Sequence, residues 1–120
     1  MLAFLLAFLL VPNKDPSILT VPAVEVHTPS LKEIALNAAQ DAGLSKEDTS
    51  QMMHTIRCES HWNPRAVSKT ADYGVAQWHL TAHGMTKAQA FDPKYSLTKM
   101  AHAFKNEHQT WWTCWRLLYS

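Results

Sequence analysis

Net charge, cysteine and long apolar runs are all scarce in this chain. Its 120 residues carry a formal charge of +1 with neutral histidines, and two of them are cysteines. A nearly balanced charge gives no electrostatic case for nucleic acid or for a strongly acidic membrane surface. The apolar run Met1–Val11 is too short to cross a bilayer as a helix. What remains is one small domain, whose modest core favours a covalent cross-link.

Two segments precede the expected domain. Residues 1–11 match the hydrophobic region of a secretory signal, although no Lys or Arg precedes them and no clear cleavage site follows. Residues 12–29 contain four prolines and no helical period, which is typical of an extended linker. We therefore predict an exported protein, located in the periplasm, in the cell envelope or outside the cell. A short membrane anchor and a truncated gene start are the alternatives for the apolar run.

Helical patterning begins at residue 30, and we predict one domain over residues 30–120. Ser30 and Glu33 form a capping-box pattern, in which each side chain satisfies a free amide donor at a helix start. Apolar residues then recur at helical spacing until Gly43, a typical residue just past a helix end. Ser45 starts a second helix, with acidic residues in its first turn.

The remaining elements are shorter. Pro64 is expected to end the second helix, and residues 66–67 and 75–76 are predicted to pair as a small hairpin between turns. Start signals at Thr86 and at Asp92-Pro93 predict two further helices, the second of which is expected to be the last. The pattern indicates a mainly α domain with a short β-hairpin.

Glu59 occupies a special position on the second helix. With a period of 3.6 residues, Met52, Ile56 and Glu59 share one face, so the apolar stripe ends in a carboxyl group. A Glu at the edge of an apolar face is partly desolvated, which raises its pKa as a general acid requires. Periodicity alone leaves an ordinary solvated Glu as the competing interpretation.

Two motifs flank a turn-rich stretch: Glu59-Ser60-His61-Trp62-Asn63-Pro64 and Asp72-Tyr73-Gly74-Val75-Ala76-Gln77. The first resembles the E-S-x-W-N-P signature of soluble lytic transglycosylases, in the lysozyme-like superfamily, whose Glu is the catalytic acid. The second is similar to their G-x-x-Q motif and to the D-Y-G-x-x-Q stretch of animal-type lysozymes, whose Asp is a second catalytic carboxylate. A third common motif, A-Y-N, is missing.

The resemblance implies a lysozyme-like α+β domain with its hairpin beside an active-site cleft. It makes Glu59 and Asp72 the catalytic candidates. The residues it implies for substrate binding are Ser60, Trp62, Ser68, Tyr73, Gly74 and Gln77. The implied substrate is the peptidoglycan glycan strand, cleaved at the β-1,4 bond between N-acetylmuramic acid and N-acetylglucosamine.

Two routes for completing that reaction stay open. If Asp72 is ionised and close, water completes a hydrolysis; otherwise the substrate's own acetamido and 6-hydroxyl groups leave an anhydro sugar, as in lytic transglycosylation. The alternative from another class is a peptidoglycan-binding or structural module without turnover. We expect a monomer that uses no metal, no cofactor and no nucleic acid.

One of the two cysteines lies among a cluster of tryptophans near the C-terminal end. Cys58 precedes the candidate acid, and Cys114 lies among the tryptophans of residues 111–115. If the chain is exported, a disulfide between Cys58 and Cys114 is predicted, with two buried thiols as the alternative. The tryptophans are candidates both for stacking on sugars and for filling the core.

The histidines do not indicate a metal site. His79 and His83 lie one turn apart, and Cys58 is near His61, but neither pair belongs to a recognised ligand set. His61 and His79 are instead candidates for lining a sugar cleft.

Overall fold

The structure is a computed structural model that describes residues 26–120. The signal-like segment 1–11 and most of the predicted linker 12–29 lie outside the described residues, so their predictions stay predictions. No helix within residues 26–120 is long and apolar enough to cross a membrane. The described part contains six α-helices, one short 3-10 helix and one two-stranded hairpin, which confirms the predicted fold class.

The elements follow one another along the chain with short connections. They are α1 (Leu31–Asp41), α2 (Lys46–Ser60), β1 (Asp72–Tyr73), β2 (Trp78–His79), α3 (Leu80–His83), α4 (Lys87–Phe91), α5 (Pro93–Lys105), η3 (Gln109–Trp111) and α6 (Thr113–Tyr119).

Side-chain caps start four helices where the sequence predicts them. At α1, Glu33 N donates to Ser30 Oγ at 3.1 Å and Ser30 N donates to Glu33 Oε1 at 2.8 Å, which completes the capping box. Thr86 caps α4 in the same reciprocal way, while Ser45 and Asp92 accept from backbone amides of α2 and α5. Local sequence signals therefore place these helix starts.

The end of α2 differs from the prediction. Pro64 was expected to end this helix, but α2 ends at Ser60, because His61 and Trp62 adopt left-handed backbone angles with φ of 52° and 63°. The earlier end leaves Glu59 in the last turn of the helix, where its side chain meets the segments that follow.

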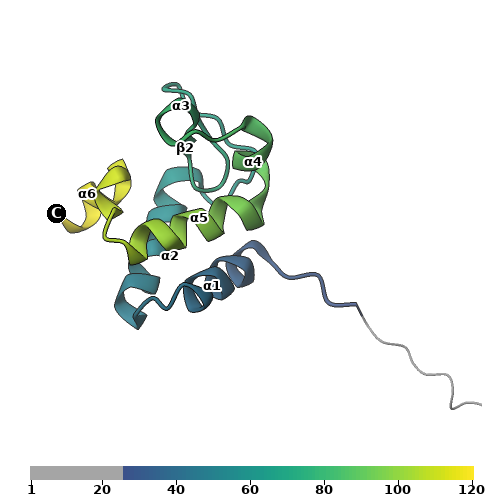
Figure 1. Cartoon of the computed structure of the whole chain (residues 1–120), viewed down its shortest axis with the longest axis vertical. Coiled ribbons are helices and arrows are strands. Elements are labelled where there is room, and N and C mark those ends of the chain that lie inside the picture. The colour runs from purple at the N-terminus through teal and green to yellow at the C-terminus, as the bar shows by residue number, and fades with distance from the viewer. Residues whose placement is uncertain (1–25) are drawn as a thin grey trace, which may run out of the picture.

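The longer helices pack against one another and form one helical layer with a shared core. α1 lies along α5, and α2 contacts both of them (Figure 1). Small side chains at fully buried positions of α1 and α5, such as Ala35, Ala39 and Ala101, permit this close approach. The large side chains that fill the core are Met52, Ile56, Leu97, Met100 and Phe104.

The hairpin lies at one end of this layer, near α3 and α4 (Figure 1). Its strands are antiparallel, with Asp72 opposite His79 and Tyr73 opposite Trp78. The predicted strand at 75–76 is wrong: both residues belong to the turn and are fully buried, because their apolar side chains enter the core there. Of the other predicted strand, Val67 forms only an isolated bridge with Tyr73.

Gly74 is required where the turn approaches α4. Its φ is +83°, and a Cβ built at this position would lie 1.9 Å from the Ala90 carbonyl oxygen. Any side chain would therefore push the turn away from α4. This contact fixes the hairpin against the helical layer.

The chain ends in a helix that the sequence did not predict. α5 was expected to be the last helix, yet η3 and α6 follow it, and α6 returns to pack on α2 (Figure 1). Trp112 precedes α6 without a side-chain capping bond, so the local start signal used for the other helices is missing.

Candidate active site

Glu59 faces a small cavity between the helical layer and the hairpin. The cavity has a volume of about 90 Å³. Its walls come from the last turn of α2, from the hairpin, from α3 and from the η3–α6 segment. The lining residues are Glu59, Asp72, Gln77, Trp78, His79, His83, Trp111, Trp112 and Thr113.

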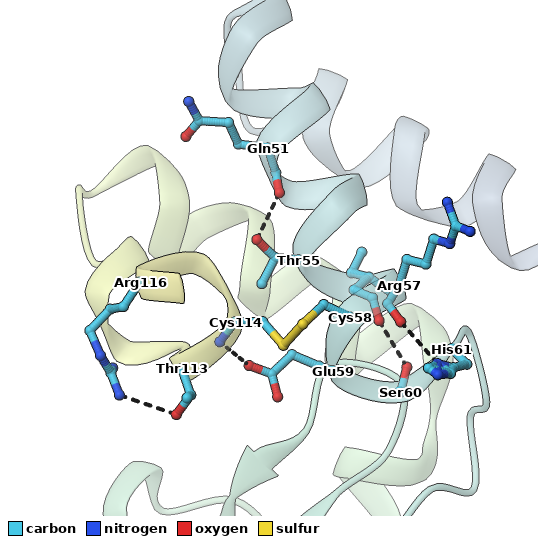
Figure 2. The surroundings of a disulfide bond; sticks show 11 residues. Gln51, Thr55, Arg57, Cys58, Glu59, Ser60, His61, Thr113, Cys114 and Arg116 are labelled. Atoms are coloured by element: carbon cyan, nitrogen blue, oxygen red, sulfur yellow. Dashed lines mark hydrogen bonds between the residues drawn. A yellow bond between two sulfur atoms is a disulfide. The ribbon is translucent and has the colours of Figure 1, made fainter. Parts of the chain in front are cut away.

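The carboxylate of Glu59 has one hydrogen-bond donor among the described residues. Cys114 N donates to Glu59 Oε2 at 3.0 Å (Figure 2). Burial raises the pKa of Glu59 and is the largest effect; the Cys114 amide acts against it, the negative charge of Asp72 adds to the rise, and Arg116 acts to lower it. The raised pKa is the direction that the apolar stripe of α2 predicts.

Asp72 lies on the opposite side of the cavity and is held by three side chains. Its Oδ2 accepts from Ser68 Oγ at 3.0 Å and from Thr70 Oγ1 at 2.6 Å, and its Oδ1 lies 3.1 Å from His79 Nδ1. Ser68 Oγ also accepts from Asp72 N at 3.0 Å, so one hydroxyl fixes both the backbone and the side chain of Asp72. The fold thus brings Asp72 and Glu59 to one cavity, although their helix and hairpin are separate in the chain.

Gln77 lines the same cavity from the end of the turn. Its φ of 53° is left-handed, and its Nε2 donates to Gly74 O at 2.9 Å and to Ala66 O at 3.2 Å. These bonds leave the amide nitrogen committed to the backbone. The side chain therefore shapes the cavity wall and holds the turn closed.

Five of the six predicted substrate-binding residues do not line this cavity. Ser60 Oγ donates to Val75 O at 2.7 Å, and the residue is 8% exposed. Tyr73 packs edge-on against Phe91, with ring centroids 5.8 Å apart, and Trp62 lies under Lys32 Nζ. With Gly74 against α4, these residues support the walls, and their contact with substrate stays a prediction. Ser68 acts on the cavity indirectly, because it hydrogen-bonds to Asp72, which lines it.

The C-terminal segment supplies three cavity residues: Trp111 and Trp112, which the sequence left open between sugar stacking and core filling, and Thr113, which it did not indicate. Trp112 is buried, and its Nε1 donates to Ala76 O at 2.7 Å. Its ring meets Trp78 edge-on, with centroids 5.1 Å apart. Thr113 follows on the cavity side. One signal was available: a bridge from Cys58 to Cys114 brings the segments that contain Glu59 and Thr113 together, and both residues line the cavity.

Two histidines contribute to the hairpin side of the cavity. His79 lines it, as the sequence suggested, while His61 is the left-handed cap of α2, away from the lining. His83 also lines the cavity, although it was not predicted from the sequence. Burial has the largest effect and lowers its pKa, and the charge of His79 lowers it further. Trp111 is partly exposed and stacks on His108 with a centroid distance of 4.2 Å, so this aromatic surface continues outward from the cavity.

The predicted disulfide is present between Cys58 and Cys114, with their Cα atoms 5.9 Å apart. It joins α2 to α6 beside the candidate acid (Figure 2). Within residues 26–120, no three His, Cys, Asp or Glu side chains gather in a way that would hold a metal ion.

A mainly helical domain with a half-buried carboxyl at the end of its second helix, facing a short hairpin across a cavity, has the architecture of the lysozyme-like class. Residues 36–119 match the family of the transglycosylase SLT domain, and the chain belongs to this family. Comparisons with curated proteins and with solved structures give no match. Membership implies a lytic transglycosylase type of function directed at peptidoglycan, which is in keeping with an exported protein.

Proposed function

We propose that this protein cleaves the β-1,4 bond between N-acetylmuramic acid and N-acetylglucosamine in peptidoglycan, with Glu59 as general acid. The observation that carries the proposal is the environment of Glu59. Its carboxyl group lies at the cavity wall, and burial raises its pKa. The backbone amide of Cys114 donates a hydrogen bond that holds the carboxyl group in place. A raised pKa favours the protonated form, which is the form that can deliver a proton to a leaving-group oxygen.

The proton of Glu59 goes to the glycosidic oxygen, and the bond from that oxygen to the anomeric carbon then breaks. Positive charge develops on the sugar ring and needs a negative or polar partner on the other side. Asp72 faces the same cavity and is held by Ser68, Thr70 and His79, so it is suited to this role. This division between two carboxylates is the rule known from lysozymes.

Family membership favours completion by the substrate's own 6-hydroxyl group, which forms an anhydro sugar. Hydrolysis is the second candidate, and the presence of Asp72 at the cavity favours it. The two products differ in mass by one water. Mass spectrometry of digested cell walls in ¹⁸O-labelled water distinguishes them, because only hydrolysis introduces the label into the new reducing end.

The test of Glu59 itself is the substitution Glu59→Gln, assayed by release of soluble fragments from purified cell walls. We expect a loss of about 10²- to 10⁴-fold in rate, the usual contribution of a general acid. Glu47→Gln is the matched control, because Glu47 is an exposed Glu at the start of the same helix. Undiminished cleavage by a folded Glu59→Gln protein contradicts the proposal, and binding without cleavage by the wild type supports a peptidoglycan-binding module instead.

A further inference from the structure

The disulfide and the candidate acid form one closed ring. Cys58 is bonded to Glu59 through the backbone, the disulfide joins Cys58 to Cys114, and Cys114 N donates back to Glu59 Oε2 at 3.0 Å. Figure 2 shows the carboxylate pointing at the start of α6 beside the sulfur bridge. Every link of the ring is covalent except that single hydrogen bond. The bridge therefore sets how far the donor can move from the acid.

The noncovalent contacts that hold α6 are few. Cys114 is the one buried residue of this seven-residue helix, and Leu117 and Leu118 are 76% and 49% exposed. Two side-chain hydrogen bonds reach α2, from Trp115 Nε1 to Gln51 Oε1 and between Tyr119 Oη and His54 Nδ1. A helix this short is unstable by itself in water, and its apolar packing beyond Cys114 comes from Trp115, which lies half-buried against the core, and from the buried Trp112 just before the helix.

We propose that the Cys58–Cys114 disulfide is a redox-dependent positioning element, which keeps α6 on α2 so that Cys114 N holds the Glu59 carboxyl group in its cleaving position. The inference rests on the proposed role of Glu59 as the acid. Once a dithiol reduces the bridge, α6 is released, the Cys114 amide leaves the carboxyl group, and cleavage slows. Activity is then confined to conditions in which the two cysteines are oxidised.

The redox step is a thiol–disulfide exchange. A dithiol gives two electrons and two protons to the bridge, which becomes two cysteine thiols, while the dithiol itself closes to a cyclic disulfide. Cys58 is an exposed residue, so such a reagent can reach the bridge. Re-oxidation reverses the exchange and restores the ring.

The contact between donor and acid can be tested without any substrate. In the oxidised full chain, we expect the ¹⁵N amide signal of Cys114 to shift with pH along the titration of Glu59. The other ionisable groups at the cavity are Asp72, His79 and His83, with Arg116 on α6 itself. The Glu59→Gln variant distinguishes the contributions of these groups, because it abolishes only the part of the Cys114 signal shift that is due to Glu59. Absence of this titration in oxidised wild type overturns the inference.

Activity supplies the second test. Reduction by dithiothreitol, or the double substitution Cys58→Ser with Cys114→Ser, is expected to lower kcat at least about tenfold, with recovery on re-oxidation of the wild type. The alkaline limb of the pH–rate profile should also move, because release of α6 removes part of the burial that raises the pKa of Glu59 together with the Cys114 amide and the Arg116 charge that lower it. Loss of packing elsewhere in the core would not move that limb.

Leu97→Ala is the matched control, since it weakens the core in α5 away from the cavity. Its pH profile should stay at the wild-type position even when its melting temperature falls as far as that of the double variant. A reduced, folded protein with the kcat and alkaline limb of the oxidised one overturns the inference. If oxidised wild type does not cleave cell walls at all, the proposed function fails, while the amide titration still decides whether the bridge positions the carboxyl group.

Discussion

The helical side of the cavity and the hairpin side each hold one carboxyl group, in opposite surroundings. On the helical side, Glu59 is half-buried, burial raises its pKa, and it has a single backbone donor from Cys114. On the hairpin side, the Asp72 side chain is 27% exposed and is surrounded by Ser68, Thr70 and His79. Apolar surroundings suit a group that must keep its proton, and polar ones suit a group that must carry charge. The two sides are thus fitted to different steps of one reaction.

The two sides also differ in what holds them together. A covalent bond fixes α6 to α2, whereas the hairpin has strands of two residues and depends on its turns. Ala71, Gly74 and Gln77 all have positive φ, at 62°, 83° and 53°. The hairpin side therefore depends on backbone conformation, and the helical side on a cross-link.

The largest effect is expected from Gly74→Ala, which perturbs the hairpin side of the cavity. Its methyl group meets the Ala90 carbonyl oxygen and also faces an unfavourable positive φ, so we expect a loss of about 4 kcal/mol or more in the free energy of unfolding. Urea unfolding followed by circular dichroism measures it.

Gly84→Ala is the control for that change. Gly84 also has a positive φ, at +59°, but a Cβ there would meet nothing within 4 Å. Only the conformational cost of about 1 kcal/mol is expected. Equal losses for the two variants would show that contact with α4 is not what fixes the turn.

The second prediction concerns the helical side of the cavity. Removal of the disulfide, by Cys58→Ala with Cys114→Ala, should cost about 2–4 kcal/mol, because the bridge closes a loop of 56 residues in the unfolded chain. Urea unfolding of oxidised wild type and of the double variant gives the difference. Reductant should lower the stability of the wild type toward that of the double variant and leave the double variant, which has no cysteine, unchanged. Equal stability of oxidised wild type and double variant contradicts the prediction.

Much of the helical side could be predicted from the sequence, because its signals are local. Ser30, Ser45, Thr86 and Asp92 are caps that act within three residues of themselves, and all four begin a helix as expected. The face of Glu59 follows from the helical period alone. Its desolvation depends on Ile56 and Met52 packing inward, which they do.

The hairpin and α6 could not be predicted, because distant contacts decide them. The residues at 75–76 read as a strand, but contacts with Ser60 and Trp112 bury them as a turn. α6 begins without a capping side chain and is fixed by Cys114. The pairing of Asp72 with His79 depends on a register that two residues per strand do not encode.

The third prediction concerns Asp72→Asn, which keeps the shape of the hairpin side and removes its charge. If Asp72 stabilises positive charge on the sugar, cleavage should fall about 10- to 100-fold, less than for Glu59→Gln. The rate of fragment release and the ¹⁸O content of the product measure it. Asp41→Asn, at an exposed helix end, is the control. Unchanged cleavage would leave Asp72 a structural residue that only holds Ser68 and Thr70.

The smallest effect is a pH dependence of stability, which tests whether burial governs Glu59. Burial raises the pKa of Glu59 in the folded protein above its unfolded value. Its contribution to stability is therefore fully present below the unfolded pKa and is lost as pH rises through the folded pKa. Relative to Glu59→Gln, wild type should lose stability as pH rises above the unfolded pKa of about 4, in urea titrations from acid to neutral pH.

Glu33→Gln provides a comparison of opposite sign within the same chain. The backbone hydrogen bond from Ser30 lowers the pKa of Glu33, followed by the contact with His27. Its contribution is present above the unfolded pKa and is lost as pH falls through the folded pKa. Relative to Glu33→Gln, wild type should therefore lose stability on acidification, the reverse of the result for Glu59→Gln. If both differences changed in the same direction, burial would not be the property that distinguishes Glu59 from an exposed capping carboxylate.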